Sequence, residues 1–363
     1  MSSTWNNNIG FTVFGESHGP AIGVVMDNVP PGESIDLDKI YQFMARRAPK
    51  QNKTSTQRKE KDMPQIMSGY FNGKTTGTPL CALIANTDQH SQDYSNLSRL
   101  ARPGHADYTG ALRYRGFNDV RGGGHFSGRL TAPLCFAGAV AGQILEKRGI
   151  YVGAHIAEIH GIKDKAFDPI NTTKDMIREV REKEFPTIID VQGNEMIKEI
   201  DKARKDKDSV GGIIECIAIN VPAGIGSPLF FRLVKSITQL FFCDPAVKGL
   251  EFGAGFKVAE MTGSENNDEF YVNDKGHVVT KTNNHGGILG GIASGMPITL
   301  RVAFKPTPSI ARPQATVDYS AMKNETLEVK GRHDPCVVPR AVPCVEAAVN
   351  IALLNHMLEY PNF

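Results

Sequence analysis

Apolar positions in the first half of the chain indicate strands and one amphipathic helix. From Leu37 to Met44, apolar residues recur at helical spacing, and either Ser34 or Asp36 can cap the start of this helix. The pattern predicts that the helix ends at Arg46-Arg47, before a proline. Three runs have the composition of strands: Phe11–Phe14, Ile22–Met26 and Leu80–Ile84.

The second half combines longer helices with further strands. Thr131–Lys147 consists mainly of small apolar residues and predicts a buried helix, whereas Leu229–Phe242 has an amphipathic pattern. Pro343–Tyr360 is apolar on nearly all sides, which predicts a buried last helix. Residues 171–208 carry two charged helical patterns, expected to form an excursion at the surface. Two strands and one loop or hairpin complete the prediction: Glu215–Val221, Pro297–Phe304 and 262–283.

Residues 86–131 contain almost no periodic apolar pattern. An irregular stretch of this length is uncommon inside a compact domain and usually carries function. Gly-rich and basic motifs lie in both halves of the chain, and no Pro/Gly/Ser linker divides it. We therefore expect residues 1–363 to form one large α+β domain with a single composite site.

The composition narrows the class of protein. The 363 residues are 40% hydrophobic and 22% charged, which excludes wholesale disorder or a fibre. A formal net charge of +2 argues against a general binder of nucleic acids or membrane surfaces. The six cysteines form no CxxC pair and the histidines show no ligand spacing, so no bound metal is expected. Without a signal-peptide pattern or a long apolar run, we expect a cytoplasmic protein with free thiols.

Two short turns each place a histidine beside glycine. GESHG follows a predicted strand and presents Ser17 and His18 at the strand end, where an imidazole can exchange protons near neutral pH. RPGHADY holds the permanent cation of Arg102 beside His105, which suggests anion binding next to proton transfer. Each also has an ordinary explanation as a surface turn, and the functional interpretation is the stronger one for RPGHADY.

The strongest single motif is RGGGHFSGR at residues 121–129. Three successive glycines let backbone N–H groups line an anion site, and a helix is predicted directly afterwards. Arg121 and Arg129 flank the glycines and add positive charge. The motif matches neither a dinucleotide-binding turn nor a nucleoside triphosphatase loop.

Three further segments contribute cations. Residues 46–61 contain seven Lys or Arg residues and form either a solvated face or a lid that closes over an anionic substrate. KPTPS places Lys305 and two hydroxyls on a rigid turn, and GRHDP combines Arg332 with Asp334. Together, the motifs suggest a buried ligand that carries phosphate or carboxylate groups.

These motifs resemble those of the chorismate synthase family. GESHG, RPGHADYTG, RGGG…SGR and GRHDPCV follow in the family's order, and the resemblance extends from about Ile9 to about Leu358. It implies one α+β domain, with helices sandwiched between antiparallel sheets, that assembles as a homotetramer. It also implies a carbon–oxygen lyase that converts 5-enolpyruvylshikimate 3-phosphate to chorismate by an anti 1,4-elimination of phosphate, in aromatic amino-acid biosynthesis. The family requires reduced FMN although there is no net redox change.

The resemblance implies roles for individual residues. His18 matches the histidine near the departing phosphate, His105 the one that protonates the reduced flavin, and Asp334 the carboxylate that assists deprotonation at flavin N5. Ser17 and Ser127 match hydroxyls linked to that proton relay. The expected substrate cations are Arg47, Lys53, Arg102 and Arg129, together with Arg121 beside the glycines. The expected flavin contacts are His125, Phe126, Ser127, Pro245, Ala246, Gly290, Lys305, Pro306, Thr307, Pro308, Ser309 and Arg332.

Two other functions stay open at this point. The first is a different FMN-dependent oxidoreductase that uses NAD(P)H. Because the chain has no recognisable dinucleotide motif, we expect instead that it depends on an external flavin reductant. The second is a non-enzymatic polyanion-binding module that uses residues 46–61. These residues lack the aromatic side chains that stack on bases, so we expect neither nucleic-acid nor membrane partners.

Overall fold

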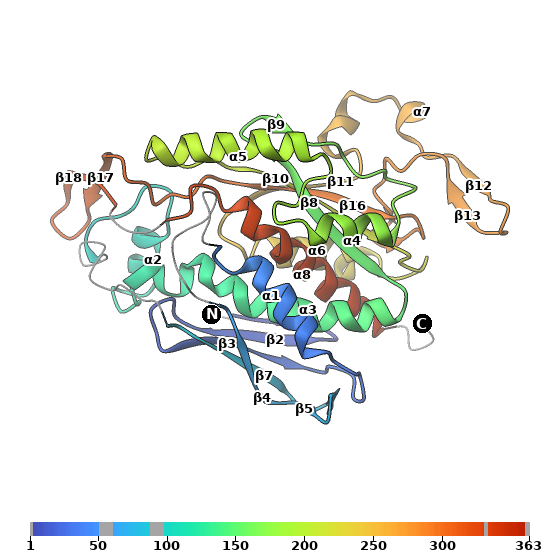
Figure 1. Cartoon of the computed structure of the whole chain (residues 1–363), viewed down its shortest axis with the longest axis horizontal. Helices are drawn as coiled ribbons and strands as arrows, with labels where there is room; N and C mark the ends of the chain where they lie inside the picture. Colours follow the sequence, from blue (N-terminus) through green and yellow to red (C-terminus); the bar gives the residue numbers. More distant parts are fainter. Residues whose placement is uncertain (1–2, 51–60, 88–97, 330–332, 360–363) are drawn as a thin grey trace.

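Two five-stranded antiparallel sheets enclose a layer of helices in the computed structural model (Figure 1). The structure describes residues 3–50, 61–87, 98–329 and 333–359. The first sheet contains, in spatial order, β1 (Thr4–Asn6), β2 (Gly10–Gly15), β3 (Ala21–Asp27), β7 (Leu80–Ala85) and β4 (Pro64–Ser68). The second contains β11 (Val247–Phe252), β16 (Ile298–Phe304), β10 (Gly212–Ile219), β8 (Tyr151–Ile159) and β9 (Ile162–Lys163). This arrangement confirms the predicted α+β sandwich.

The helices between the sheets form the core. They are α1 (Leu37–Arg47), α3 (Thr131–Lys147), α6 (Leu233–Phe241) and α8 (Val338–Met357). Nearly every side chain of α3 and α8 is buried. The two helices pack so closely that a Cβ on Gly138 would lie 2.2 Å from the Cβ of Ala347. A glycine at this position is therefore needed for the two backbones to approach each other.

Helix α1 shows how local sequence defines an element. Its start is capped by Asp36, whose side chain accepts hydrogen bonds from the backbone N–H groups of Asp38 and Lys39. Ile40 and Met44 lie on the buried face. The helix ends with Arg46-Arg47, as predicted, and its last turn reaches the region where the loops of both sheets meet.

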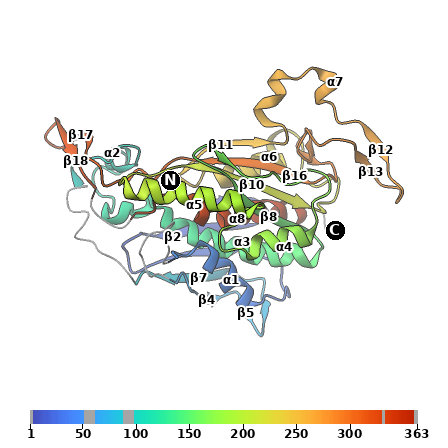
Figure 2. The ribbon, with the colours of Figure 1, turned by 45° about the horizontal axis from the view of Figure 1, so that its top comes forward.

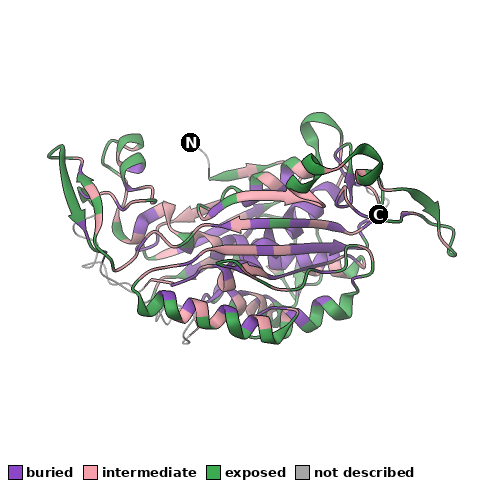
Figure 3. Ribbon diagram, turned by 90° about the horizontal axis from the view of Figure 1, so that it is seen from above, coloured by how far each residue is buried: buried purple, intermediate pink, exposed green. Residues whose placement is uncertain are grey.

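The outer side of the second sheet carries two charged helices. They are α4 (Lys174–Glu182) and α5 (Asp190–Lys205), and they match the two charged helical patterns predicted within residues 171–208. Ile177 of α4 packs against Gly153 of β8, where a Cβ would lie 2.3 Å from the Ile177 side chain. Because the sheet is covered on both sides, its central strands are largely buried, while the outward side of α5 is exposed (Figure 3).

Small hairpins complete the fold. One hairpin pairs β17 (Gln314–Asp318) with β18 (Lys323–Leu327), and another pairs β12 (Phe270–Val272) with β13 (Val278–Thr280). These two hairpins project from opposite ends of the molecule (Figures 1 and 2). The second pair confirms a hairpin within 262–283, which also holds α7 (Gly263–Asn266). Two shorter hairpins are β5 (Tyr70–Phe71) with β6 (Lys74–Thr75), and β14 (Ile288–Leu289) with β15 (Ile292–Ala293).

Two predicted helix starts are wrong. The helix predicted from Leu229 begins only at Leu233, because Leu229 has a φ of 54° and the exposed turn Leu229–Phe231 gains no burial. The last helix begins at Val338, so Pro343 lies inside it. An internal proline costs about 3 kcal/mol, and burial of the apolar side chains in the first turns of α8 offsets that cost.

The irregular segment 86–131 also differs in detail from the prediction. Its described part contains the short helix α2 (Asp107–Arg113) and two 3-10 turns, Arg121–Phe126 and Gly128–Leu130. Strand β8, in contrast, carries no alternating pattern that sequence analysis could detect, because both of its faces are covered.

Candidate active site

A cavity of about 500 Å³ lies where the ends of α1, α3 and α8 meet the loops of the second sheet. Cavities of this size hold small-molecule ligands. Segments far apart in the sequence form its walls: Arg47, 102–109, 122–131, 244–248, 304–309 and 333–344. Residues from three of the four motifs therefore meet at one cavity, whereas Ser17 and His18 of GESHG lie outside its lining.

Most of the predicted site residues reach this cavity. The ones in its lining are Arg47, Arg102, His105, Phe126, Ser127, Arg129, Pro245, Ala246, Lys305, Pro306, Thr307, Pro308, Ser309 and Asp334. Predicted residues outside the lining are Ser17, His18, Arg121, His125 and Gly290. Lys53, Arg332 and most of the proposed lid at 46–61 lie outside the described residues.

The triple-glycine loop joins the two histidine motifs. Gly122, Gly123 and Gly124 all have positive φ values, of 60°, 83° and 53°, which glycine adopts without strain. A Cβ on Gly122 would lie 2.3 Å from the ring of His18, and a Cβ on Gly123 would lie 2.9 Å from the ring of His105. Both imidazoles therefore pack directly against the loop, and the glycines are required by this close approach.

Arg102, Asp107 and His105 form a buried cluster at the cavity wall. Arg102 donates two hydrogen bonds to the Asp107 carboxylate, from Nε at 2.8 Å and from Nη2 at 2.7 Å, and a third to Ser309 Oγ at 3.1 Å. His105 Nδ1 lies 3.0 Å from Asp107 Oδ1. The cluster thus fixes both the guanidinium and the ring orientation of His105.

The cluster also sets protonation states. Burial lowers the pKa of His105, and the positive charges of Arg102 and Lys305 lower it further, although Asp107 opposes this. Burial disfavours ionisation of Asp107, but its hydrogen bonds with Arg102 and His105 prevail and hold its pKa well below the usual range. Asp107 is therefore a carboxylate, and His105 is neutral near pH 7.

A second cluster joins two cavity arginines through Asp62, a residue that the sequence analysis missed. Arg47 Nη1 lies 2.6 Å from Asp62 Oδ2, and Arg129 Nη1 pairs with Asp62 Oδ1. Arg47 also donates to the backbone oxygen of Gly128 at 2.9 Å. Burial raises the pKa of Asp62, but the two guanidiniums outweigh this effect and lower it. The sequence signal was an aspartate directly after the basic segment 46–61.

The remaining wall mixes charges with apolar surface. Arg340 Nη1 lies 2.5 Å from Asp334 Oδ2, and Lys248 and Lys305 add two ammonium groups. The Thr307 hydroxyl is buried and bonds to no described residue. Apolar atoms come from Phe126, Phe304, Pro306, Val337 and Ala341. Unused donors beside apolar surface suit an anionic ligand that has a flat apolar part.

The predicted residues outside the lining have other partners. His125 lies with Nδ1 2.9 Å from the backbone oxygen of Gly15 and Nε2 2.6 Å from Ser3 Oγ. Arg121 is half-exposed and pairs with Asp119 at 2.7 Å. Gly290 is in the turn between β14 and β15. A role of these side chains in ligand binding stays a prediction.

Comparison with known proteins identifies the family. The family model described as chorismate synthase matches residues 9–358. This chain belongs to the chorismate synthase family. A chorismate synthase of Pyrococcus abyssi is 48% identical over 351 residues, which cover 96% of each chain. One of Korarchaeum cryptofilum is 47% identical over 349 residues, covering 95% of this chain and 94% of its own.

A solved structure supports the same conclusion. A chorismate synthase crystal structure superposes with a TM-score of 0.74 and 28% identity, covering 98% of this chain and 93% of its own. The predicted family, fold and enzyme class are therefore confirmed: the chain is a carbon–oxygen lyase of the chorismate synthase family that acts on a phosphate-bearing substrate. Among the described residues, no helix is both long and apolar enough to cross a lipid bilayer.

Proposed function

We propose that the protein converts 5-enolpyruvylshikimate 3-phosphate to chorismate with loss of phosphate, using reduced FMN, as a step of aromatic amino-acid biosynthesis. The observation that carries the proposal is the cavity, which combines four arginines and two lysines with His105 on a chain of this family. The substrate has a phosphate and carboxylates, and FMN has a phosphate and a flat ring. The cationic and apolar parts of the lining match these features.

Reduced FMN fits the residues on one side of the cavity. Lys305–Ser309, Pro245-Ala246 and Phe126 would hold it, with Lys305 and Lys248 near its phosphate and the unpartnered Thr307 hydroxyl free to hydrogen bond. When bound, reduced FMN supplies the electron density that helps phosphate to depart and takes up the hydrogen lost from the substrate ring. The protein residues bind, orient and exchange protons around it.

Arg47 and Arg129 stabilise the charge that develops on the departing phosphate. Asp62 holds both guanidiniums in the cavity wall, where their positive charges face a bound anion. Donors that are oriented in advance stabilise a developing negative charge without further rearrangement. His18 lies directly behind Gly122, and we expect it to assist departure of the phosphate from there.

His105 moves a proton at Nε2. Its Nδ1 lies 3.0 Å from both Asp107 Oδ1 and Arg102 Nη2, so the ring is held with Nε2 beside Gly123, and Gly122 on the same loop lines the cavity. An anionic ligand next to the ring opposes the effect of burial and raises the affinity of the imidazole for a proton. Asp334, held by Arg340, offers a carboxylate as proton acceptor on another wall.

An anaerobic assay of phosphate release tests the proposal. The protein is mixed with the enolpyruvyl substrate, with and without chemically reduced FMN, and phosphate and chorismate are measured. We expect equal amounts of both products, formed only with reduced FMN. Release that is independent of reduced FMN, or no release at all, would contradict the proposal.

Three further properties are proposed from the family. The protein is a cytoplasmic homotetramer, and it uses FMN reduced by an external reductant. Light scattering after size-exclusion chromatography should give four times the chain mass. Turnover with oxidised FMN and NADPH alone would contradict the need for an external reductant.

A further inference from the structure

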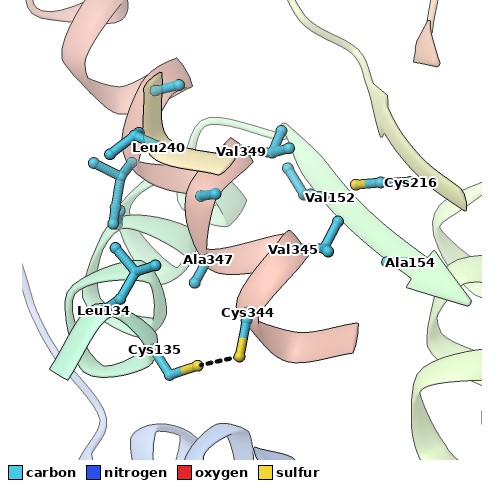
Figure 4. Close-up of a cluster of buried hydrophobic side chains, with 14 of the residues drawn as sticks. Leu134, Cys135, Val152, Ala154, Cys216, Leu240, Cys344, Val345, Ala347 and Val349 are labelled. Carbon is cyan, nitrogen blue, oxygen red and sulfur yellow. Dashed lines mark hydrogen bonds between the residues drawn. The ribbon is translucent and has the colours of Figure 1, made fainter. Parts of the chain in front are cut away.

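Two thiols face each other at the floor of the cavity. Cys344 on α8 contributes to the cavity lining, and Cys135 lies opposite it on α3 with an Sγ–Sγ distance of 3.6 Å (Figure 4). Cys344 is 7% exposed and Cys135 is fully buried. The Cys135 thiol donates to Cys344 Sγ, and the Cys344 thiol donates to the backbone oxygen of Arg340 at 3.7 Å.

The surroundings make the two thiols unequal. The hydrogen bond from Cys135 lowers the pKa of Cys344 and, although burial opposes this, the positive charge of Arg47 adds to the effect. Burial raises the pKa of Cys135. Cys344 is thus the more nucleophilic thiol and the one that a small molecule in the cavity can reach. Cys216 is fully buried, and burial also raises its pKa.

The helix packing holds the pair in place. One turn further along both helices, Gly138 packs so closely against Ala347 that a Cβ on Gly138 would lie 2.2 Å from the Ala347 Cβ. The two sulfurs must shorten their separation to about 2.05 Å to bond. Formation of the bond therefore requires the two cysteine side chains to move toward each other between the packed helices.

We propose that Cys344 and Cys135 form a reversible thiol–disulfide pair whose oxidation by a hydroperoxide is controlled by occupancy of the cavity. The Cys344 thiolate attacks the O–O bond and becomes a sulfenic acid, and the alcohol leaves. The Cys135 thiol then attacks the Cys344 sulfur, a disulfide forms and water leaves. In sum, two thiols and one hydroperoxide give one disulfide, one alcohol and one water. A ligand in the cavity blocks the first step.

Oxidation of the reduced full-length protein with tert-butyl hydroperoxide tests the chemistry. Peptide mass spectrometry under non-reducing conditions should show a Cys135–Cys344 cross-link that dithiothreitol removes. Cys135→Ser can still donate a hydrogen bond to Cys344 and should instead accumulate a sulfenic acid on Cys344 that dimedone labels, while Cys216→Ala should behave as the wild type. Absence of the cross-link in folded wild-type protein, or equal oxidation of Cys216 and Cys344, would overturn the proposal.

Protection by ligand tests the access route. FMN binding is first measured by fluorescence quenching, and oxidation is repeated with oxidised FMN at about 100 times its Kd. The rate of cross-linking should fall about 100-fold, in proportion to the free protein. An unchanged rate with FMN demonstrably bound would contradict control by the cavity. Failure of FMN to bind would instead contradict the proposed function, and the cross-link itself would still test the thiol pair.

Discussion

Two histidines that each pair with a carboxylate differ in whether the second ring nitrogen also has a partner. In the second sheet, His155 Nδ1 lies 3.1 Å from Asp164 and its Nε2 lies 2.7 Å from Glu215, so both ring nitrogens are paired with carboxylates. At the cavity, His105 uses Nδ1 for Asp107, and no described residue bonds to its Nε2. His155 therefore acts as a structural cross-link, whereas His105 keeps a nitrogen for chemistry.

Neighbouring residues on α1 repeat this contrast. Arg46 makes two hydrogen bonds to the fully buried carboxylate of Glu346, at 2.5 and 2.9 Å, and this carboxylate also accepts from the backbone N–H of Ala154. Arg47, the next residue, lines the cavity and pairs with Asp62. Burial and ion pairing alone do not identify a functional charge. What separates the two arginines is position, because Arg47 lies in the cavity wall and Arg46 does not.

Substitution of His105 and of His155 should give the largest difference between a catalytic and a structural effect. His105→Ala should lower turnover by about 10²–10⁴-fold, the loss expected for a proton-transfer group, with FMN binding and folding retained. His155→Ala should instead lower stability, because it leaves two buried carboxylates without their partner. Steady-state rates and urea unfolding measure both effects. A near-normal rate in His105→Ala would mean that its role is misassigned.

Removal of a buried structural carboxylate should have the second-largest effect. Glu346→Ala leaves Arg46 without its buried partner and should destabilise the fold by about 3–5 kcal/mol. Glu195→Ala is the matched control, because Glu195 forms an exposed pair with Lys198, and it should cost less than about 1 kcal/mol. Urea unfolding of both variants measures the difference. Equal losses of unfolding free energy in both variants would contradict the expectation that the buried ion pair matters more than the exposed one.

Lysine substitution of Arg46 and of Arg47 on α1 should separate a role in substrate binding from a role in the fold. Arg47→Lys keeps the charge but cannot bond to Asp62, Gly128 and a ligand together, so KM for the phosphorylated substrate should rise by about 10-fold or more. Arg46→Lys should leave KM unchanged within about threefold, because Arg46 lies outside the cavity lining. Similar changes in KM for both variants would argue against a direct role of Arg47.

The smallest expected effect is on the pH dependence of stability, to which His155 and His105 should contribute in opposite directions. Burial opposes protonation of His155, but its two carboxylates prevail and raise its pKa. Its contribution to stability is complete below about pH 6.5, the unfolded value, and is lost as pH rises through the folded pKa. Because the pKa of His105 is lowered, His105 costs stability as pH falls from about 6.5 through its folded pKa.

Urea unfolding between pH 5 and 9 tests this opposition. The stability difference between wild type and His155→Gln should shrink with rising pH, whereas the wild type should lose stability relative to His105→Gln as pH falls. Parallel curves for the two variants would show that the histidines do not differ in this way.

Much of the local structure could be predicted from the sequence. Helix α3 has the predicted bounds, Asp36 caps α1, and the Gly-rich turns lie at the cavity or directly behind it. Cap residues, glycine conformations and apolar periodicity act over a few residues, so the local sequence is sufficient for them. Strand β8 and the start of α8 escaped prediction because burial in the assembled core outweighs local preference there.

By itself, the sequence determined which residues can carry chemistry here: the histidines, arginines and glycines of four motifs that also identify the family. Only the tertiary structure decided how they are used. It placed Asp62 between Arg47 and Arg129, turned His125 toward Gly15, and set Cys135 opposite Cys344. These contacts join residues far apart along the chain, and they depend on how the helices and sheets pack, which no local pattern specifies.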